Sequence, residues 1–554
     1  MKKAIIFFCL TAFACVGCIK NDLPYPVIVP NITSMTVQDA VQVDIDYEAR
    51  EVTVVLSETT DLAEVVIQSV EIDVDSASVS VELVGVHDLT QPLKFEITTY
   101  QTYEWTIKAI RPIERYFTVK GQIGSAEIDE RNCRAIAKVS KGTNVSAITV
   151  TSLKLGPKDI TTYSLAPEQM KDFSEGVSVD VTAFGQTKTW KLYVEVSDIS
   201  VEIVKVIPWT LSAYVTAMAE AGKETVFQYR EAGADAWTDV SADAVTSDGG
   251  TFVAHITGLA PVTEYEVKVI SGSEQTPAVS FITADATRIP NGSFEYASLV
   301  NGANYYKFYD PSCGVADGQS MFWGSGNGEG SEGVNGSASM GIIITTIDRQ
   351  DKVDGNQSVC AQTSQMAGIL AAGNLFTGQF AGLVGTEGGR VNFGRPWTTR
   401  PVALKLYCKY TTSKIDIIGK KMPPGITLTK DDFDRAQIKV ALGTWDYRVY
   451  GGSKDSPVHI NTTDASTFVD FSKDQSTIAH GNLIIHNDGY ILNGADMVSA
   501  LTDQWAEYII PLDYHDLDIL PTHIIVSCAA SQYGDYFTGC SSSRLWIDKV
   551  ELVY

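Results

Sequence analysis

Residues 258–269 read GLAPVTEYEVKV, and this stretch indicates the kind of fold that surrounds it. Gly258 and Pro261 favour a turn, because glycine accepts backbone angles that other residues avoid and proline fixes its own φ angle. After the turn, apolar and polar side chains alternate, with Tyr265 and Val267 on one face. A period of two is typical of a strand that buries one face. The stretch therefore predicts a β-sheet protein and argues against a helical bundle.

The residues on either side extend this pattern into a complete domain, predicted at 201–287. The order Leu-x-Pro-x-Thr-x-Tyr at 259–265 resembles the corner between strands E and F of fibronectin type III domains. Phe-Gln-Tyr-Arg at 227–230, Trp237 and the closing strand 279–283 are similar to the same family. The resemblance implies that the corner tyrosine hydroxyl bonds to upstream backbone. Such domains usually space or present other domains, so we assign this one no chemistry.

Upstream of this domain the sequence repeats itself at an offset of 83 residues (127 − 44). The acidic-Ile-Asp triplet at 44–46 recurs at 127–129, and the strand-like segment 65–72 recurs at 148–155. Both copies place apolar residues at a period of two between polar turns, which predicts β-sandwiches. They resemble the immunoglobulin-like repeats of bacterial surface lipoproteins. We expect one domain at 32–111 and a second at 112–200, with Trp105 and Trp190 in their cores.

The first residues predict how the chain is targeted. Residues 1–17 have a basic start and a short apolar run, which are the features of a signal peptide. The Gly17-Cys18 pair that follows resembles the lipobox of bacterial lipoproteins, which implies cleavage before Cys18 and a diacylglycerol on its thiol. Residues 18–31 are proline-rich and are expected to be an extended linker. We therefore expect a cell-envelope protein at the outer membrane, periplasmic or surface-exposed, with lipid as its sole membrane contact.

The composition excludes some classes of partner and site. Forty-two Lys and Arg against 67 Asp and Glu give a net charge of −25, which lacks the basic footprint of a nucleic-acid-binding protein. The nine cysteines include no CxxC motif, so we expect buried single thiols rather than a zinc site or a disulfide scaffold. No HExxH or GxSxG motif is present, which leaves zinc peptidase and α/β-hydrolase chemistry without support.

Residues 288–554 form the largest predicted domain and are rich in Gly, Ser, Asn and aromatic residues. The opening segment 289–295 and the closing segment 545–554 resemble the first and last strands of jelly-roll carbohydrate-binding modules. In those modules an opening glutamate and a closing aspartate help to hold a structural calcium ion. The resemblance places Glu295 and Asp548 in these roles, and carboxylate oxygens are ligands that Ca²⁺ prefers.

Between these two ends, several segments in order resemble one family. It is the putative carbohydrate metabolism domain found at the C-terminus of lipoproteins from gut Bacteroidetes. The resemblance implies a jelly-roll related to glycan-binding modules and no established reaction. The family's usual Ser-Ser pair is replaced here by Ala529-Ala530-Ser531. The expected fold is all-β, with tandem immunoglobulin-like and fibronectin type III sandwiches before a large jelly-roll sandwich. The matching segments are 322–327, 373–378, 393–397, 400–410, 521–531 and 534–539.

Candidate binding residues follow from the chemistry of sugars. A pyranose ring has an apolar face, so its site needs an aromatic ring for stacking beside amide or charged groups for the hydroxyls. Several such residues lie in or beside glycine-, asparagine- and arginine-rich segments of the last domain. They are Trp323, Trp397, Trp445 and Tyr536 for stacking, with Asn327 and Arg395 for hydrogen bonds.

We expect the last domain to bind a glycan while the preceding sandwiches act as a spacer. A glycoside-active enzyme is one alternative, and it would need two carboxylates roughly 5 to 9.5 Å apart across the scissile bond. A protein-binding adhesin or structural surface protein is the other alternative. No catalytic pair is chosen, because the sequence does not show which carboxylates converge. The available carboxylates are Glu387, Asp431, Asp432, Asp434 and Asp446.

Overall fold

The computed structural model describes residues 28–47, 49–198, 200–300, 305–308, 322–328, 336–385, 388–420, 422–423, 426–498 and 503–554. The expected signal peptide, Cys18, most of the linker and Glu387 lie outside these residues. Lipidation of Cys18 therefore stays a prediction. Within the described ranges, no helix combines the length and apolar character that a membrane crossing requires.

The chain divides into two compact units, residues 1–197 and 198–554. The first unit begins with a β-sandwich whose two sheets have the strand orders β1-β4-β6 and β2-β3-β8-β7-β5. Its core contains Trp105, which is fully buried as predicted. The elements are β1 Ile32–Val37, β2 Ala40–Asp46, β3 Glu51–Leu56, η1 Leu62–Glu64, β4 Val65–Ile72, β5 Ser78–Val79, β6 Gly85–His87, β7 Leu93–Thr98 and β8 Thr102–Ile110.

A second sandwich completes this unit, with the strand orders β12-β9 and β10-β11-β15-β14-β13. In both sandwiches one parallel strand pair joins otherwise antiparallel neighbours, β3 with β8 and β11 with β15. Trp190 lies in the second core. The elements are β9 Tyr116–Val119, β10 Glu127–Asp129, β11 Arg134–Ser140, η2 Val145–Ala147, β12 Val150–Lys154, β13 Thr162–Tyr163, η3 Pro167–Gln169, β14 Val177–Ala183 and β15 Gln186–Ser197.

The second unit begins with the fibronectin-like sandwich, whose strand orders are β16-β17-β21-β20 and β19-β18-β22-β23, with β24 beside β22. The Tyr265 hydroxyl accepts a 2.9 Å hydrogen bond from the Ala260 backbone N–H, so the predicted corner contact is confirmed. The elements are β16 Val201–Pro208, β17 Ser212–Ala219, β18 Thr225–Glu231, β19 Thr238–Asp239, η4 Ala242–Ala244, β20 Val245–Asp248, β21 Thr251–Thr257, β22 Glu264–Ser271, β23 Glu274–Gln275 and β24 Val279–Ile282.

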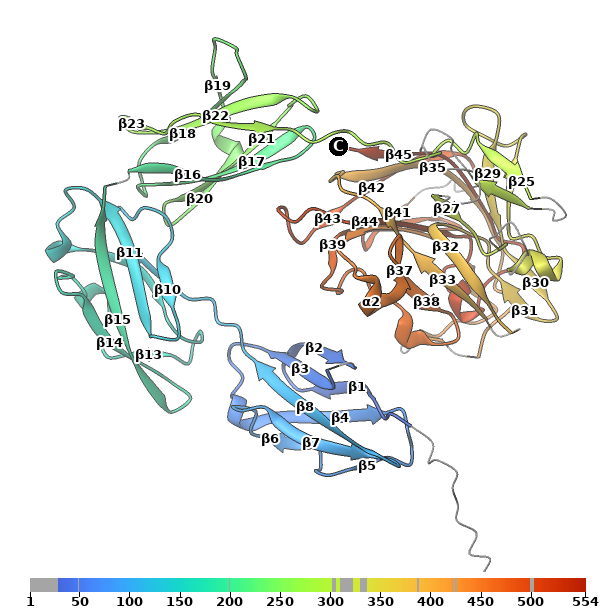
Figure 1. Ribbon diagram of the computed structural model, residues 1–554, viewed down its shortest axis with the longest axis horizontal. Coiled ribbons are helices and arrows are strands. Elements are labelled where there is room, and N and C mark those ends of the chain that lie inside the picture. Colours follow the sequence, from blue (N-terminus) through green and yellow to red (C-terminus); the bar gives the residue numbers. More distant parts are fainter. Residues whose placement is uncertain are drawn as a thin grey trace, which may run out of the picture. The chain divides into compact units, whose positions relative to one another are not determined.

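The C-terminal sandwich, yellow to red in Figure 1, packs a 14-stranded sheet against a 5-stranded sheet of order β28-β29-β45-β35-β42. The main path of the large sheet is β25-β26-β27-β32-β44-β36-β39-β40-β41, and β33, β34, β37, β38 and β43 lie beside it. The all-β prediction is thus confirmed.

The bounds of its strands and short helices are as follows. They are β25 Ala297–Leu299, β26 Tyr306–Phe308, β27 Trp323–Gly324, η6 Ser337–Met340, β28 Thr345–Asp348, β29 Ser358–Gln362, β30 Ser364–Met366, β31 Ile369–Ala371, β32 Asn374–Val384, β33 Gly388–Phe393, β34 Arg395–Pro396, β35 Ala403–Thr411, β36 Ala436–Gly443, α2 Tyr447–Tyr450, β37 Gly451–Ser453, β38 Ser456–Asn461, η7 Ala465–Thr467, β39 Thr477–His486, β40 Gly489–Leu492, β41 Ala495–Val498, β42 Ala506–Pro511, β43 Asp513–Tyr514, β44 His523–Ala529, η8 Gly534–Tyr536 and β45 Arg544–Val553.

The core between these two sheets follows the alternation of the strands. On β36, Ile438 and Val440 point into the core, and from the smaller sheet Leu406 meets them. Cys408 and Cys528 lie in the same core as free thiols, in line with the expectation of buried single cysteines. Since successive side chains of a strand face opposite ways, the residues between these core positions must lie on the outer face of the large sheet.

The fibronectin-like sandwich is in direct contact with the C-terminal sandwich. Trp209, the residue directly after β16, is only 4% exposed. Its ring centroid lies 4.7 Å from that of Tyr514 on β43. This sandwich is therefore joined to its neighbour by side-chain packing, and its role as a spacer stays a prediction.

Candidate functional site

A groove of about 660 Å³ lies on the outer face of the large C-terminal sheet. Its volume is within the range of small-molecule binding sites. The floor is formed by β32, β44, β36 and β39, which are hydrogen-bonded in that order. Loop residues 468–472 and 531–536 supply its walls.

The register of these strands places polar side chains in a row across the floor. Lys439 on β36 is paired with Ser527 on β44 and with Asn482 on β39. Paired residues on one face of an antiparallel sheet have Cβ atoms about 5 Å apart. Beside this row, the Gln437 side-chain amide donates a 2.9 Å hydrogen bond to Asn482 Oδ1. The floor therefore presents amide, hydroxyl and ammonium groups close together.

Two buried polar atoms at the groove have no hydrogen-bond partner within the described part of the chain. They are His480 Nδ1 on β39 and Gln532 Oε1 in one of the loop walls. Burial and the neighbouring His515 lower the pKa of His480, so the ring is neutral at neutral pH. An unpaired buried polar atom is costly, so these two atoms are exceptions among the buried polar groups of the described part of the chain.

A buried carboxylate anchors the wall at 531–536. Asp434 is 3% exposed. Its Oδ2 accepts hydrogen bonds from the Ser531 hydroxyl at 2.6 Å, the Cys540 backbone N–H at 2.8 Å and the Ser543 hydroxyl at 2.8 Å. The two ends of the loop that carries Tyr536 are thus tied to one carboxylate. Asp434 therefore positions this wall from beneath the surface.

The second wall, residues 468–472, rests on a small apolar cluster of its own. Phe471 lies against Trp445 with ring centroids 5.7 Å apart, and the Trp445 indole donates a 2.9 Å hydrogen bond to Asp474. Phe468 meets Tyr536 from the first wall in an edge-to-face contact with a centroid separation of 5.2 Å. Half-buried aromatic rings from both walls therefore come together beside the polar floor.

Acidic groups outnumber basic ones around the groove. The acidic side chains are those of Asp470, Asp513 and Asp535, and desolvation raises the pKa of Asp535; Lys439 is the cation among the lining residues. The chain as a whole carries a net charge of −25. A negatively charged ligand would thus be repelled at short range and at long range.

The structure places most of the sequence-predicted sugar residues away from this groove. Trp323 is 1% exposed, and its indole donates a 2.8 Å hydrogen bond to the Pro290 carbonyl. Trp397 is 5% exposed, and Trp445 is 2% exposed beneath Phe471. None of these three rings offers a face for sugar stacking. Tyr536 is the predicted aromatic residue that lines the groove.

The two predicted polar ligands of sugar are also internal. Asn327 is fully buried and donates to the Thr345 carbonyl at 2.6 Å, while its Oδ1 accepts from Ile344 N at 2.8 Å. Arg395 is 2% exposed, and its guanidinium donates to the Ser456 hydroxyl at 2.9 Å and to the Gly378 carbonyl at 2.5 Å. Both side chains hold loops together, so the predicted binding role does not fit their surroundings.

Glu295 and Asp548 both act as hydrogen-bond acceptors for one loop. Asp548 is fully buried and accepts from the backbone N–H groups of Val353 at 2.9 Å and Asp354 at 3.2 Å. Glu295 accepts from the Asn356 backbone N–H at 2.9 Å and from its side-chain amide at 2.8 Å. Burial raises the pKa of Asp548, and the Glu295 charge adds to the effect.

This donor set does not fit a calcium ion. Ca²⁺ takes six to eight oxygen ligands, whereas the partners of these carboxylates are N–H groups. Across the described ranges, no three His, Cys, Asp or Glu side chains gather in a way that could hold a metal. We therefore assign Glu295 and Asp548 to anchoring the loop at 353–357.

The carboxylates considered for hydrolysis do not line the groove. Asp431 pairs with Lys414 on the surface, and Asp446 caps α2. Asp432 accepts from the Thr429 backbone N–H at 2.7 Å, which closes a local turn. With Asp434 buried beneath the wall, no pair from this group faces a common cleft in the described part of the chain.

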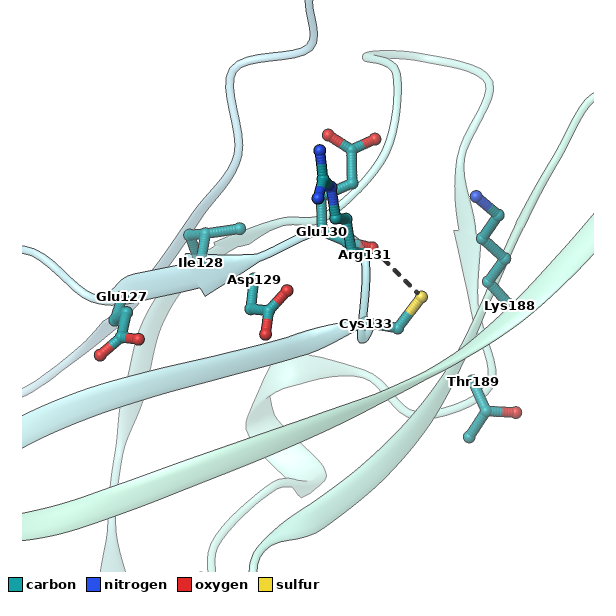
Figure 2. Close-up of a pocket in the computed structure, with 8 residues that line it drawn as sticks. All are labelled: Glu127, Ile128, Asp129, Glu130, Arg131, Cys133, Lys188 and Thr189. Atoms are coloured by element: carbon teal, nitrogen blue, oxygen red, sulfur yellow. Dashed lines mark hydrogen bonds between the residues drawn. The ribbon is translucent and has the colours of Figure 1, made fainter. Parts of the chain in front are cut away.

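A second hollow lies in the second immunoglobulin-like sandwich, beside the hairpin of β10 and β11 (Figure 2). Several of its polar groups already have partners within the protein. Asp129 accepts from the Asn132 backbone N–H and side-chain amide at 3.1 and 2.7 Å. Cys133 Sγ lies 3.7 Å from the Glu130 carbonyl oxygen. The lining contains no aromatic ring, so this hollow lacks the stacking surface that a sugar needs.

The floor residues were missed in the sequence because strand adjacency is not visible there. A signal was nevertheless present. Gln437 and Lys439 alternate with apolar residues in one strand, and His480 and Asn482 occupy alternate positions in another. Such polar positions in strands of a large domain mark an outer sheet face, but only the fold shows that they converge.

Comparisons with known proteins show a similarity to a carbohydrate-related domain in the part of the chain that contains the groove. Residues 293–553 match the family model described as "Putative carbohydrate metabolism domain". None of the curated proteins gives a significant match. Among solved structures, similarity is found to a putative glycoside hydrolase from Bacteroides thetaiotaomicron, with 16% identity over 78% of this chain and 92% of that chain and a TM-score of 0.28. A putative glycoside hydrolase from Bacteroides vulgatus has 20% identity over 48% of this chain and 97% of that chain, with a TM-score of 0.30. A carbohydrate-binding module specific for non-crystalline cellulose has 10% identity over 43% and 90%, with a TM-score of 0.18.

Replacing the buried wall anchor tests its structural role. Asp434→Ala should lower the free energy of unfolding by about 2 to 4 kcal/mol, because several buried donors lose their acceptor. Chemical denaturation followed by circular dichroism measures the change. The control is Asp431→Ala, whose side chain is 93% exposed and which should change stability little. Equal effects of the two substitutions would contradict the anchoring role.

Removing calcium tests the assignment of Glu295 and Asp548. The melting temperature of the chain should be the same with a chelator and with added calcium, because amide donors already satisfy both carboxylates. Differential scanning calorimetry gives the comparison. A clear fall on chelation, reversed by calcium and absent in Glu295→Gln, would instead support the ion expected from the sequence.

Proposed function

We propose that the chain binds a glycan in the groove of its C-terminal sandwich. The observation that carries this proposal is the row formed by Ser527, Lys439 and Asn482 beneath two aromatic walls. A sugar presents hydroxyl groups at its edges and C–H groups on its faces, so it needs polar atoms and an apolar ring within one site. The groove supplies both.

The polar floor suits a hydroxyl-rich ligand. A sugar hydroxyl can act as donor and acceptor, so it can bond to amide and hydroxyl groups such as those of Gln437 and Ser527. The family match over residues 293–553 supports a carbohydrate as the ligand. Binding by preformed hydrogen bonds and ring contacts requires no covalent step.

The aromatic wall gives the first test of binding. Tyr536→Ala should weaken the affinity for a glycan identified by array screening about tenfold, which equals roughly 1.4 kcal/mol. The physical reason is the loss of an apolar surface beside the polar floor. Isothermal titration calorimetry on the whole chain measures the affinity.

The matched control is Tyr407→Ala. This tyrosine is also half-buried, but it lies on β35 of the smaller sheet and donates its hydroxyl hydrogen to Glu507. Its loss should leave the affinity unchanged. An unaltered affinity in Tyr536→Ala would argue against the groove, and release of reducing ends from a bound glycan would favour the enzyme alternative.

The charge of the groove predicts which glycans bind. A neutral oligosaccharide should bind at least about tenfold more tightly than its uronic-acid counterpart of the same linkage, because lining carboxylates outnumber Lys439. Titrations at low ionic strength give the largest difference. Tighter binding of the charged counterpart would show that the carboxylates do not set the ligand class.

A further inference from the structure

The segment 513–518 connects the groove with the fibronectin-like sandwich. Its first two residues form β43, which pairs with β39 so that Asp513 lies opposite His480 and Tyr514 opposite Ala479. Asp513 lines the groove. His515 stacks on His480 with ring centroids 5.1 Å apart. One end of the groove is therefore built by this segment.

The same segment contacts the fibronectin-like sandwich on its other side. Tyr514 packs against Trp209 with ring centroids 4.7 Å apart. The Trp209 indole donates a 3.2 Å hydrogen bond to the Leu517 carbonyl. Lys205 on β16 forms an ion pair with Asp518. The side chains of Asp513 and Tyr514 point to opposite sides, because they are consecutive residues of one strand.

Arg400 contacts both sides of the junction between the two sandwiches. Its guanidinium donates to the Pro208 carbonyl at 2.8 Å and to the Leu517 carbonyl at 2.6 Å. It also lies over the Trp209 ring, 5.1 Å from the centroid. Arg400 is 5% exposed, so these contacts are sheltered from water. A planar guanidinium with several donors is well suited to hold two backbones in one geometry.

We propose that the fibronectin-like sandwich positions the His480 and Asp513 end of the groove through the segment 513–518. Glycan affinity then depends on Trp209, although this residue does not line the groove. The inference rests on the proposed glycan function. It makes Trp209 a positioning residue, since it acts on the ligand through Tyr514 and the strand that also carries Asp513.

The affinity test compares two tryptophans of the same sandwich in the whole chain. Trp209→Ala should weaken glycan binding roughly 2- to 30-fold, the range found for residues that couple distant positions. Trp209→Phe keeps a ring against Tyr514 and should restore most of the affinity. The control Trp237→Ala removes a ring that contacts Arg230 and Lys268 of its own sandwich, and it should leave affinity unchanged.

Hydrogen exchange measures the same coupling without a ligand. In Trp209→Ala the amides of 513–518 should exchange faster, whereas those of β36 should not change. Trp209 packs outside the sandwich core formed by residues such as Phe227 and Val267, so that core should stay folded. Calorimetry checks this point. If Trp209→Ala unfolds the sandwich, Arg400→Lys replaces it in the test. This substitution weakens the contacts between the two sandwiches and leaves the core of the fibronectin-like sandwich intact.

The outcomes separate the two proposals. If the unaltered chain binds no glycan, the proposed function fails, and exchange in 513–518 alone decides whether the sandwich positions this segment. If glycan binds and Trp209→Ala changes neither the glycan affinity nor the hydrogen exchange of 513–518, the proposed coupling is wrong. The proposal that the groove binds glycan then still stands. Equal losses of glycan affinity in Trp209→Ala and Trp237→Ala would also overturn the proposed coupling, because the effect would then be general destabilisation of the sandwich.

Discussion

Side chains along a β-strand must face alternate sides of the sheet, and the proposed site depends on this constraint. On β36 the alternation sends Ile438 and Val440 into the core and leaves Gln437 and Lys439 on the outer face. The same pattern on β44 and β39 brings Ser527 and Asn482 to either side of Lys439. A shift of one residue in any pairing would bury the polar row and expose the core. The folding of the sandwich and the chemistry of the groove therefore share one register.

The walls above this floor are held by polar groups that the core encloses. The Asp434 carboxylate is buried. Burial of a carboxylate is costly unless hydrogen-bond donors surround it, and the loop 531–540 supplies those donors. Arg400 has the equivalent role at the junction with the fibronectin-like sandwich. In both places a buried charge fixes a loop that contributes to the groove. The shape of the groove and the domain arrangement within residues 198–554 thus depend on the same kind of contact.

The amino-acid sequence predicted the class of fold because apolar periodicity reports burial directly. The alternation around Tyr265 and the buried Trp105 and Trp190 follow from local patterns. The residues of the candidate site were harder to predict. Trp323 and Trp397 lie in glycine- and arginine-rich segments that suggest exposed loops, yet packing against distant strands buries both rings. Asn327 and Arg395 were misassigned for the same reason, since a polar side chain that bonds internal carbonyls looks identical in sequence to one that bonds a ligand.

The residues that do meet in the groove come from strands far apart in sequence. Tyr536 was identified because an aromatic residue beside glycines is a recognisable loop feature, but its neighbour Phe468 is 68 positions away (536 − 468). Pairing of β36 with both β44 and β39 is a property of the folded sheet, and no local motif encodes it. The contact of Trp209 with Tyr514 is equally non-local.

The most direct test of the central claim is a crystal structure of the chain with a bound neutral oligosaccharide. The groove account predicts sugar density over the polar floor and beside Tyr536, with a hydroxyl group within hydrogen-bond distance of Lys439 or Asn482. Density for the sugar on another face of the C-terminal sandwich, with this groove empty, would contradict it.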